Sequence, residues 1–410
     1  MAGQLQLAFV SFKKDSYIVV EGKQNADRFF IIHQGKVLIS KMVEVVEEEG
    51  GNTLGPGDFF GVVSSMSSHS HIETARALTD IVLISVQKEQ YGELIQKNTP
   101  VAMKIILQFS KRLRYLDGAL SRLTLKNTAE EDPSHLFHVA EYYLRQSRYD
   151  QAYYSYTKYI KYCPLGENVK TAREKMQKIA MYVKNSKIEF GPTEFNRVYP
   201  KNSMLFAEGE PGDELFIIQK GSVTIAKVVD DNEVLLAVLK VGDIFGEMAL
   251  LEAKPRAASA VAYEECQVLA VNRANFEQMI KSQPQLIAKL TTLLAERIWF
   301  IYKQLANTLI RDPLGRMYDV LLMQLEKNRV PVKSQAPYTF DFGLKELASM
   351  VGLSQKDANL VLRKMLENKK ITLEKDKIKT VSVEEIAKQT EFYRKMQQIE
   401  KSRQEGRSQT

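Results

Sequence analysis

Hydrophobic and polar residues alternate along two short stretches that lie far apart in the chain. These stretches read FFIIHQGKVLIS at residues 29–40 and LFIIQKGSVTIA at residues 215–226, and a glycine interrupts each of them. Alternation broken by glycine predicts short β-strands joined by tight turns. After each stretch the spacing of apolar residues changes to that of an amphipathic helix. In residues 285–311 an apolar stripe of helical period includes Leu290, Leu294, Ile298, Ile301, Leu305 and Leu309.

The two β-rich modules are copies of one another. The segment GDFFG at residues 57–61 matches GDIFG at residues 242–246 with an offset of 185. Upstream, the segment that begins at Ala26 mirrors the one that begins at Gly212. Similarity over this length indicates an internal duplication. We therefore expect two β-rolls, each followed by a long helix, and name them roll one (residues 1–127) and roll two (residues 188–310).

Residues 245–260 carry the densest chemistry, in the segment FGEMALLEAKPRAASA. Gly246 permits a sharp backbone turn. Glu247 can accept hydrogen bonds, and Arg256 offers a planar fork to phosphate oxygens. This spacing closely resembles the phosphate-binding cassette of the cyclic-nucleotide-binding superfamily. The resemblance implies that roll two binds a cyclic nucleotide as an allosteric ligand.

The same resemblance implies the role of each residue. Arg256 and the amides from Gly246 to Ala249 would hold the phosphate, Glu247 the ribose, and Ser259 would add a hydroxyl group. Ala257 follows the arginine, as in members that favour cyclic AMP, whereas members that favour cyclic GMP often have threonine there. The expected ligand-binding residues are Gly246, Glu247, Met248, Ala249, Arg256, Ala257 and Ser259.

Roll one lacks the two charged side chains of this motif. At the shared offset, Val62 stands in the place of Glu247 and His71 in the place of Arg256. Loss of a charged partner from a polar pocket weakens binding steeply. We therefore predict that roll one is degenerate and binds cyclic nucleotide weakly or not at all.

The segment between the rolls, residues 128–187, has a helical pattern. Residues 136–164 resemble one tetratricopeptide repeat, with the turn between its two helices at residues 147–150. A single repeat cannot bury its own apolar face. We expect it to lean on the preceding long helix, on the helix that begins near Glu167, or on a partner protein.

The long helices after the rolls leave two arrangements open. They could pair within one chain as a pseudo-dimer, or residues 285–310 could pair with the same helix of a second chain in a homodimer. Trp299, the only tryptophan, lies on the second helix. We expect it in a core or an interface rather than stacked on a purine.

Residues 342–371 have the rhythm of a helix-turn-helix, and the alternating segments around residues 375–377 predict a β-hairpin wing. Roll, long helix and this module follow in the order of the catabolite-activator and fumarate-nitrate-reduction regulators, which residues 190–385 resemble. The resemblance implies a winged helix-turn-helix in residues 311–385 that enters the major groove of DNA. Leu360 stands where related activators often carry arginine.

Bases and phosphates would be contacted by different residues of this module. Gln355 and Asn359 can bond adenine edges, while Lys356, Lys364, Lys369 and Lys370 can meet phosphates. Residues 311–410 hold 20 Lys and Arg against 14 Asp and Glu, which suits a nucleic-acid partner. The expected DNA-binding residues are Ser354, Gln355, Lys356, Asn359 and Lys364.

Composition narrows the class of protein. The 410 residues exceed one ordinary core, and no apolar run approaches the ~20 residues of a membrane span. Cys163 and Cys266 match no metal spacing, so we expect no metal and a reducing, cytoplasmic location. We find no catalytic triad spacing and no Walker-type phosphate loop, which argues against an enzyme.

We therefore expect an α+β chain with two β-rolls, a helical linker, a winged helix-turn-helix and a charged tail at residues 386–410. Its expected function is DNA-binding transcription regulation in response to a cyclic nucleotide, with cyclic AMP favoured over cyclic GMP. Two alternatives stay open. One is a nucleotide-sensing interaction protein whose winged module no longer binds DNA and whose repeat-like linker binds a protein. The other is a DNA-binding regulator with a different ligand.

Overall fold

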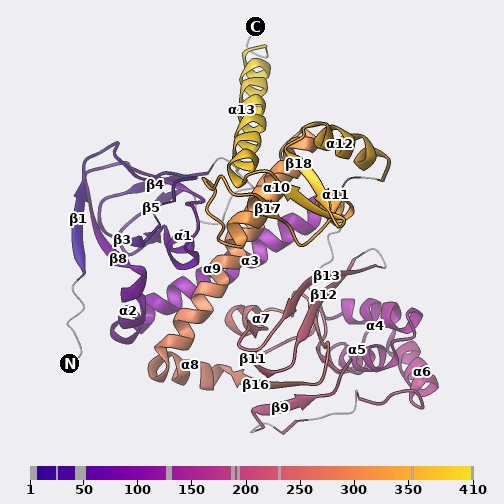
Figure 1. The fold of residues 1–410 in the computed structure, drawn as a ribbon. Coiled ribbons are helices and arrows are strands. Elements are labelled where there is room, and N and C mark those ends of the chain that lie inside the picture. The colour runs from indigo at the N-terminus through magenta and orange to yellow at the C-terminus, as the bar shows by residue number, and fades with distance from the viewer. Residues whose placement is uncertain are drawn as a thin grey trace. The chain divides into compact units, whose positions relative to one another are not determined.

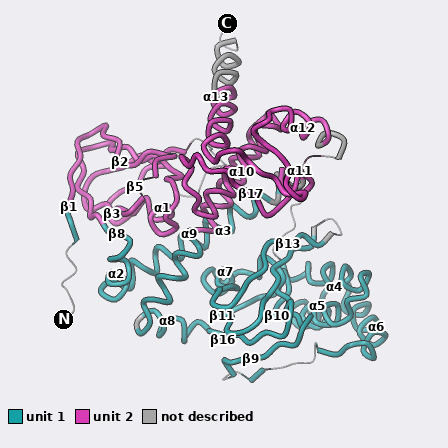
Figure 2. Tube along the Cα trace, viewed as in Figure 1, with its two compact units in different colours: residues 1–8, 86–295 teal, residues 9–85, 296–410 magenta. Residues whose placement is uncertain are grey.

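The computed structural model describes residues 7–24, 26–41, 52–125, 132–185, 190–191, 194–229, 232–351, 353 and 355–407. They form two compact units that do not follow the order of the chain (Figure 2). One unit spans residues up to 8 together with 86–295, and the other spans 9–85 together with 296–410. The first unit therefore combines the helices that follow roll one with roll two. The predicted domain boundaries run in chain order and stay predictions.

Roll one and roll two have the same topology (Figure 1). The strand order β1-β8-β3-β6 of roll one corresponds to β9-β16-β11-β14 of roll two, and β2-β7-β4-β5 corresponds to β10-β15-β12-β13. The strands of roll one are β1 Ala8–Phe12, β2 Tyr17–Val19, β3 Arg28–Gln34, β4 Val37–Ser40, β5 Thr53–Leu54, β6 Phe59–Phe60, β7 Thr74–Ala77 and β8 Ile81–Gln87. Those of roll two are β9 Asn196–Tyr199, β10 Met204–Phe206, β11 Glu214–Lys220, β12 Val223–Val229, β13 Asn232–Leu239, β14 Ile244–Phe245, β15 Ser259–Ala262 and β16 Cys266–Asn272.

The helices of the two rolls correspond as well. A short helix follows the strand β6 or β14, and a shorter and a longer helix follow the last strand of each roll. These helices are α1 Val62–Ser67, α2 Tyr91–Lys97 and α3 Thr99–Leu125 in roll one, and α7 Glu247–Glu252, α8 Arg273–Ser282 and α9 Pro284–Thr308 in roll two; a 3-10 turn, Lys88–Gln90, precedes α2. The predicted duplication is therefore confirmed in the fold.

Each roll is filled by the apolar positions of its alternating strands. In roll one the rings of Phe30 and Phe60 stack with centroids 5.4 Å apart, and in roll two Phe216 and Phe245 stack at 5.4 Å. Both pairs link a central strand to the short strand that leads into α1 or α7. The aromatic pair thus fixes the start of the short helix against the sheet in both copies.

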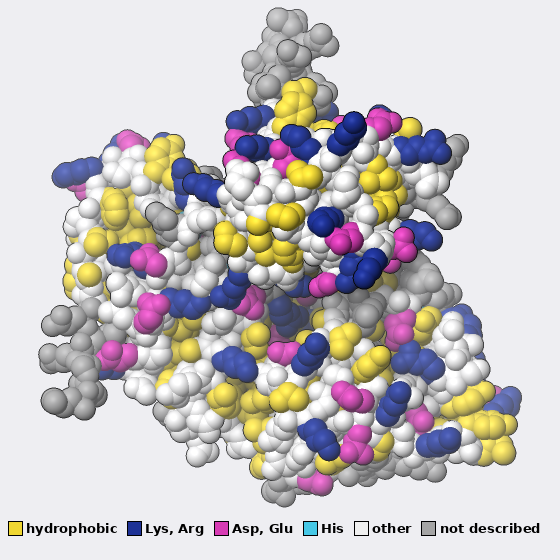
Figure 3. All heavy atoms as spheres, viewed as in Figure 1, with side chains coloured by type: hydrophobic (Ala, Val, Ile, Leu, Met, Phe, Trp, Pro, Cys, Tyr) yellow, Lys and Arg dark blue, Asp and Glu magenta, His cyan; other side chains and the backbone are white. Residues whose placement is uncertain are grey.

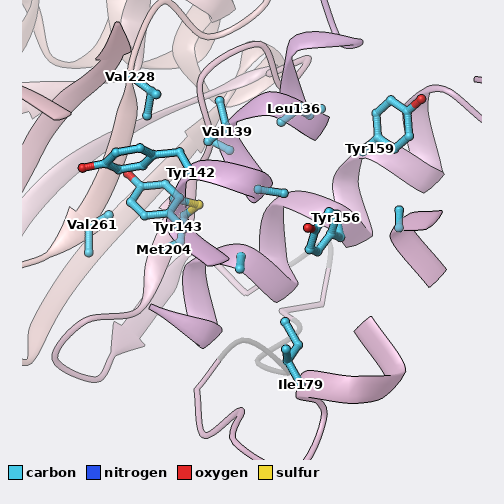
Figure 4. Close-up of a cluster of buried hydrophobic side chains, with 14 residues drawn as sticks. Leu136, Val139, Tyr142, Tyr143, Tyr156, Tyr159, Ile179, Met204, Val228 and Val261 are labelled. Carbon is cyan, nitrogen blue, oxygen red and sulfur yellow. The ribbon is translucent and has the colours of Figure 1, made fainter. Parts of the chain in front are cut away.

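The linker consists of α4 (His135–Arg145), α5 (Tyr149–Tyr162) and α6 (Val169–Ile179). The helices α4 and α5 pack along one another and form a hairpin around Ser147, and α6 packs on α5. The linker helices share one hydrophobic cluster with Met204 and Val261 of roll two (Figure 4). Of the supports we expected, α6 is therefore used, but roll two itself was missing from the prediction.

The C-terminal module is a helical domain with a three-stranded sheet. The carboxylate of Asp312 caps α10 by accepting hydrogen bonds from the next backbone amides, and Pro313 begins the helix. The wing turns at Lys375 and Asp376, both with positive φ, as a two-residue hairpin requires. The elements are α10 Pro313–Lys327, β17 Tyr338–Thr339, α11 Leu344–Met350, α12 Gln355–Glu367, β18 Ile371–Glu374 and β19 Lys377–Thr380. The predicted fold class is confirmed.

A last helix, α13 (Val383–Arg407), packs against α10. The segment predicted as a charged tail continues this helix, and Ile386 and Thr390 are buried, so its first turns belong to the core of the module. Within the described ranges, no helix has both the length and the hydropathy that crossing a bilayer requires.

Candidate functional site

The candidate site of roll two begins at the turn between β14 and α7. Gly246 lies between them with φ 77° and ψ 0°, in the left-handed region that favours glycine. A Cβ atom at this position would lie 2.7 Å from Nη1 of Arg256 and 3.3 Å from the carbonyl oxygen of Glu214. Glycine is therefore required both by the turn and by the close approach of the arginine.

The Arg256 side chain folds across this turn and is only 5% exposed. Its Nη1 donates to the carbonyl oxygens of Gly246 at 2.6 Å and Glu214 at 2.7 Å. Its guanidinium carbon lies 4.3 Å from the centroid of the Phe206 ring, which adds a cation–π contact. The structure thus brings Gly246 and Arg256 together, as the sequence predicted.

The electrostatics of this arginine favour an anion. Burial lowers the pKa of the Arg256 guanidinium, and the carboxylates of Glu210 and Glu214 act in the opposite direction. Its Nε has no hydrogen-bond partner among the described residues. A buried cation with an unused donor is stabilised by an anion that enters the roll, and phosphate matches the fork geometry of guanidinium.

The remaining predicted ligand residues line α7 and β15. Glu247 is 2% exposed, Met248 and Ala249 are also buried, and Ala257 is half-buried. Ser259 is buried too, and its hydroxyl oxygen accepts a hydrogen bond from the backbone N–H of Glu208 at 2.9 Å. The acid and the arginine of the cassette are therefore both enclosed by roll two.

The residue at the arginine position has the same backbone pairing in both rolls. The N–H of Arg256 donates to the carbonyl of Glu210 at 2.8 Å, and the N–H of His71 donates to the carbonyl of Lys23 at 2.9 Å. In each roll the preceding glycine donates back, at 2.9 Å and 2.8 Å. Roll one therefore keeps the backbone of the site and differs in its side chains.

Roll one places its own carboxylate at the start of α1. Oε1 of Glu73 accepts a hydrogen bond from the N–H of Gly61 at 2.9 Å, and Glu73 is 7% exposed. Gly61 has the same φ of 77° as Gly246. The amide hydrogen of Gly61 is thus already bonded to a carboxylate of the protein, and the negative charge of that carboxylate disfavours an anionic ligand at the same place.

Sequence reasoning missed Gly212. A Cβ atom there would lie 2.3 Å from Nε and 2.4 Å from Cζ of Arg256, so only glycine leaves room for the guanidinium. The duplication carries the signal, because roll one has Ala26 at this position and His71 in place of the arginine. The two positions differ together between the copies.

The long helix after roll one contacts the cassette of roll two. The hydroxyl of Ser110 and Nε of Arg114 donate to the carboxylate of Glu252, at 2.6 Å and 3.0 Å. The side chains of Arg114 and Glu252 are 7% and 2% exposed. Nη1 of Arg114 also donates to the carbonyl of Pro255 at 3.2 Å. A buried ion pair therefore joins α3 to the end of α7.

The matching contact in roll one is made by the second half of α9. Nε1 of Trp299 donates to the carbonyl of Ser70 at 3.2 Å, and its ring stacks on His69 at 4.1 Å. At the offset of 185, Trp299 corresponds to Arg114 and Ser70 to Pro255. Within one chain, each long helix therefore contacts the short-helix region of the other copy. Trp299 is a buried core residue.

The expected DNA-binding residues lie around α12. Gly352 and Ser354 fall outside the described residues, and the side chains of Gln355 and Lys356 are not described. Asn359 and Lys364 are exposed, as are Leu360, Lys369 and Lys370. Arg363, which the sequence reasoning did not select, is exposed on the same helix.

On the face drawn in Figure 3, basic side chains of the winged module are scattered rather than gathered in one block. Lysine and arginine side chains there alternate with acidic and apolar ones. The exposed Arg363 and Lys364 of α12 therefore offer cations to an anionic partner, and no single basic patch dominates the face drawn.

Comparison with known proteins agrees with this geometry. The family model described as "Cyclic nucleotide-binding domain" matches residues 9–98 and 196–283. The chain is 31% identical over 165 residues to the CRP-like cAMP-activated global transcriptional regulator of Mycobacterium tuberculosis, covering 40% of this chain and 74% of that protein. It is 30% identical over 172 residues to the cyclic AMP receptor protein of Thermus thermophilus, covering 42% and 76%.

A solved structure, the catabolite activator protein of Thermus thermophilus, matches 48% of this chain and 90% of that chain with 26% identity and a TM-score of 0.28. Both matched segments of the family model coincide with the rolls described above. The chain belongs to the family of CRP-like regulators and contains two copies of the cyclic nucleotide-binding domain.

Proposed function

We propose that this chain is a cytoplasmic, non-enzymatic transcription regulator that binds cyclic AMP in roll two and DNA through its winged module. The observation that carries the proposal is the buried Arg256, which has a donor without a partner among the described residues and lies beside the turn at Gly246. Cyclic AMP is favoured over cyclic GMP because Ala257 follows the arginine and because the names of similar proteins specify cyclic AMP.

In this proposal Arg256 binds the phosphate, Glu247 accepts a hydrogen bond from the ribose, and Ser259 contributes its hydroxyl group. Roll one binds cyclic nucleotide weakly or not at all, because Val62 and His71 replace the two charged residues and the Glu73 carboxylate accepts a hydrogen bond from the N–H of Gly61. The chain therefore has one sensor and one structural copy.

The signal would leave the sensor through α7. The ion pair between Arg114 and Glu252 ties this helix to α3, so a shift of α7 on ligand entry is passed to a long helix. A ligand changes an equilibrium only by its different affinity for the two states. The proposal thus requires that cyclic AMP binds more tightly to the DNA-binding state.

The ligand half of the proposal is tested by isothermal titration of the full chain with cyclic AMP. We expect one site per chain and weaker binding of cyclic GMP. Two sites per chain would contradict the degenerate role of roll one. If the chain melts cooperatively but neither nucleotide gives a saturable binding heat, the regulator with a different ligand is favoured.

The DNA half is tested by gel shifts on total genomic fragments at a series of salt concentrations. Neutralised phosphates release counterions, so affinity should fall as salt rises, and cyclic AMP should tighten binding. An affinity that does not change with salt would instead favour the interaction protein with a retired winged module. Sedimentation with and without cyclic AMP then decides whether two chains join through residues 285–310 or one chain works alone.

A further inference from the structure

The helical linker packs directly on roll two, against side chains of β10, β12 and β15. Leu136 and Tyr143 of α4 lie in one cluster with Val228 and Val261 of roll two, and Met204 of β10 joins the same cluster (Figure 4). This contact is an extended buried surface, because most of these side chains have exposed fractions near zero. The linker therefore forms part of the wall of roll two rather than a loose connection.

Helix α5 adds polar contacts along residues 202–210, the segment that contains β10. Nε2 of Gln151 donates to the carbonyl of Asn202 at 2.7 Å. The hydroxyl of Tyr154 lies 3.1 Å from the carbonyl oxygen of Leu205 and 3.0 Å from Oε2 of Glu210. Nζ of Lys158 lies 2.6 Å from Oε1 of Glu210. Two residues one helical turn apart on α5 thus meet the same carboxylate.

The other side of this segment holds Arg256. The carbonyl of Glu210 accepts from the N–H of Arg256, and the Phe206 ring lies under the guanidinium. Glu210 is 5% exposed, and its Oε2 also accepts from the N–H of Ala207 at 3.0 Å. Residues 206–210 therefore contact α5 on one side and Arg256 on the other.

We infer that Tyr154 and Lys158 of the linker are positioning residues for cyclic-nucleotide binding: they hold Glu210, and through it the backbone and charge balance of Arg256. This inference rests on the function proposed above. A buried carboxylate beside a phosphate site repels the ligand unless a cation and a hydrogen-bond donor compensate it. Lys158 supplies the cation and Tyr154 the donor.

The duplication supports this assignment. In roll one the residue that pairs with the backbone of His71 is Lys23, where roll two has Glu210. The acid that the linker contacts is thus present only in the copy that has the arginine. Burial, together with the Glu210 carboxylate, raises the pKa of the Tyr154 hydroxyl well above its usual value, so this group remains a donor.

The experiment compares the affinity for cyclic AMP of the full-length wild-type chain with two variants of α5. Tyr154→Phe and Lys158→Met should each weaken binding by roughly tenfold, since each removes a hydrogen bond to a charged group. The matched controls are Tyr153→Phe, a neighbouring ring in the linker core, and Lys161→Met, an exposed lysine on the same helix. Both controls should bind as the wild type does.

A second readout separates positioning from loss of folded protein. The two phosphorothioate diastereomers of cyclic AMP differ only in which exocyclic phosphate oxygen is replaced by sulfur. A displaced guanidinium changes the ratio of their affinities, whereas partial unfolding lowers both affinities equally. We expect the ratio to change in Tyr154→Phe and Lys158→Met and to stay constant in the controls.

The outcomes distinguish this inference from the proposed function. If the wild type binds and Arg256→Lys weakens binding, but the α5 variants match their controls in affinity and ratio, the positioning role is wrong and the sensor stands. If the folded wild type does not bind cyclic AMP, the proposed function fails first. Lys158→Met changes a partly exposed side chain and so keeps the test decisive should Tyr154→Phe not fold.

Discussion

Roll one and roll two share their strand order, their turn geometry and the backbone pairing at the arginine position, yet only roll two has the acid and the arginine of the proposed anion site. The guanidinium of Arg256 lies against Gly212 and Gly246, whereas roll one has His71 in place of the arginine and Ala26 in place of Gly212. The β-roll is thus held by its aromatic and apolar core. Its chemistry depends on a handful of positions that can change without loss of the fold.

The two rolls also differ in how a long helix contacts the region of the short helix, α7 in roll two and α1 in roll one. Roll two uses a buried ion pair, Arg114 with Glu252, where roll one uses a neutral hydrogen bond from Trp299. The two contacts lie at the same position in the fold, but we expect the ion pair to stabilise the protein more than the neutral hydrogen bond does. The following substitutions test this contrast between the rolls.

The largest effect is expected for Arg114→Met. Removing the buried partner leaves the Glu252 carboxylate with only the Ser110 hydroxyl and the exposed Lys254 ammonium as partners, which should lower the free energy of unfolding by about 3 kcal/mol. Trp299→Phe, which removes the corresponding neutral hydrogen bond, should lower it by roughly 1–2 kcal/mol. Urea unfolding of both variants measures the difference. Equal losses would show that the two contacts are alike in strength.

Arg256→Ala should reduce the affinity for cyclic AMP by about 100-fold or more, because a charged hydrogen-bonding partner of the phosphate is lost. His71→Ala in roll one should leave the affinity unchanged. Isothermal titration gives both values. A wild-type affinity in Arg256→Ala would show that the ligand does not use this site.

Gly212→Ala should weaken binding by roughly tenfold, since the new methyl group must displace the guanidinium. The reverse change in roll one, Ala26→Gly, should leave cyclic AMP affinity as it is. Isothermal titration with cyclic AMP measures both affinities, and thermal melting confirms that both variants fold. An unchanged affinity in Gly212→Ala would mean that the arginine moves away from this glycine when the ligand binds.

The smallest effect concerns the winged module, which has no counterpart in roll one. Lys364→Ala should weaken DNA binding several-fold on all sequences and lower the salt slope by about one. Asn359→Ala should instead relax preference at one base pair. Gel shifts over a salt series separate these effects. A uniform loss in Asn359→Ala would remove it from base recognition.

Local patterns were sufficient for much of the fold. The alternation at residues 29–40 and 215–226 gave the strands on both sides of each turn, and the offset of 185 gave the duplication. The cassette in residues 245–260 placed Gly246 and Arg256 at one turn because the contact is local in sequence. The wing followed from two alternating segments around residues 375–377.

Contacts between distant segments were not predictable in the same way. Nothing in the sequence of α3 alone indicates that Arg114 meets a carboxylate more than a hundred residues away. The linker was expected to lean on neighbouring helices, but its apolar face fits the outer side of roll two. Tyr154 was missed because its importance depends on that packing, and Gly212 because its importance depends on the path of the Arg256 side chain, although the difference between Ala26 and Gly212 was visible in the chain.

Placing two sensor-like copies in one polypeptide has an evolutionary consequence. In an assembly of identical subunits, a substitution changes every copy of the binding site at once. Here His71 and Arg256 occupy corresponding positions and can vary independently, because one polypeptide contains both copies. The tandem arrangement therefore permits one copy to become pure scaffold, and it fixes their stoichiometry at every protein concentration.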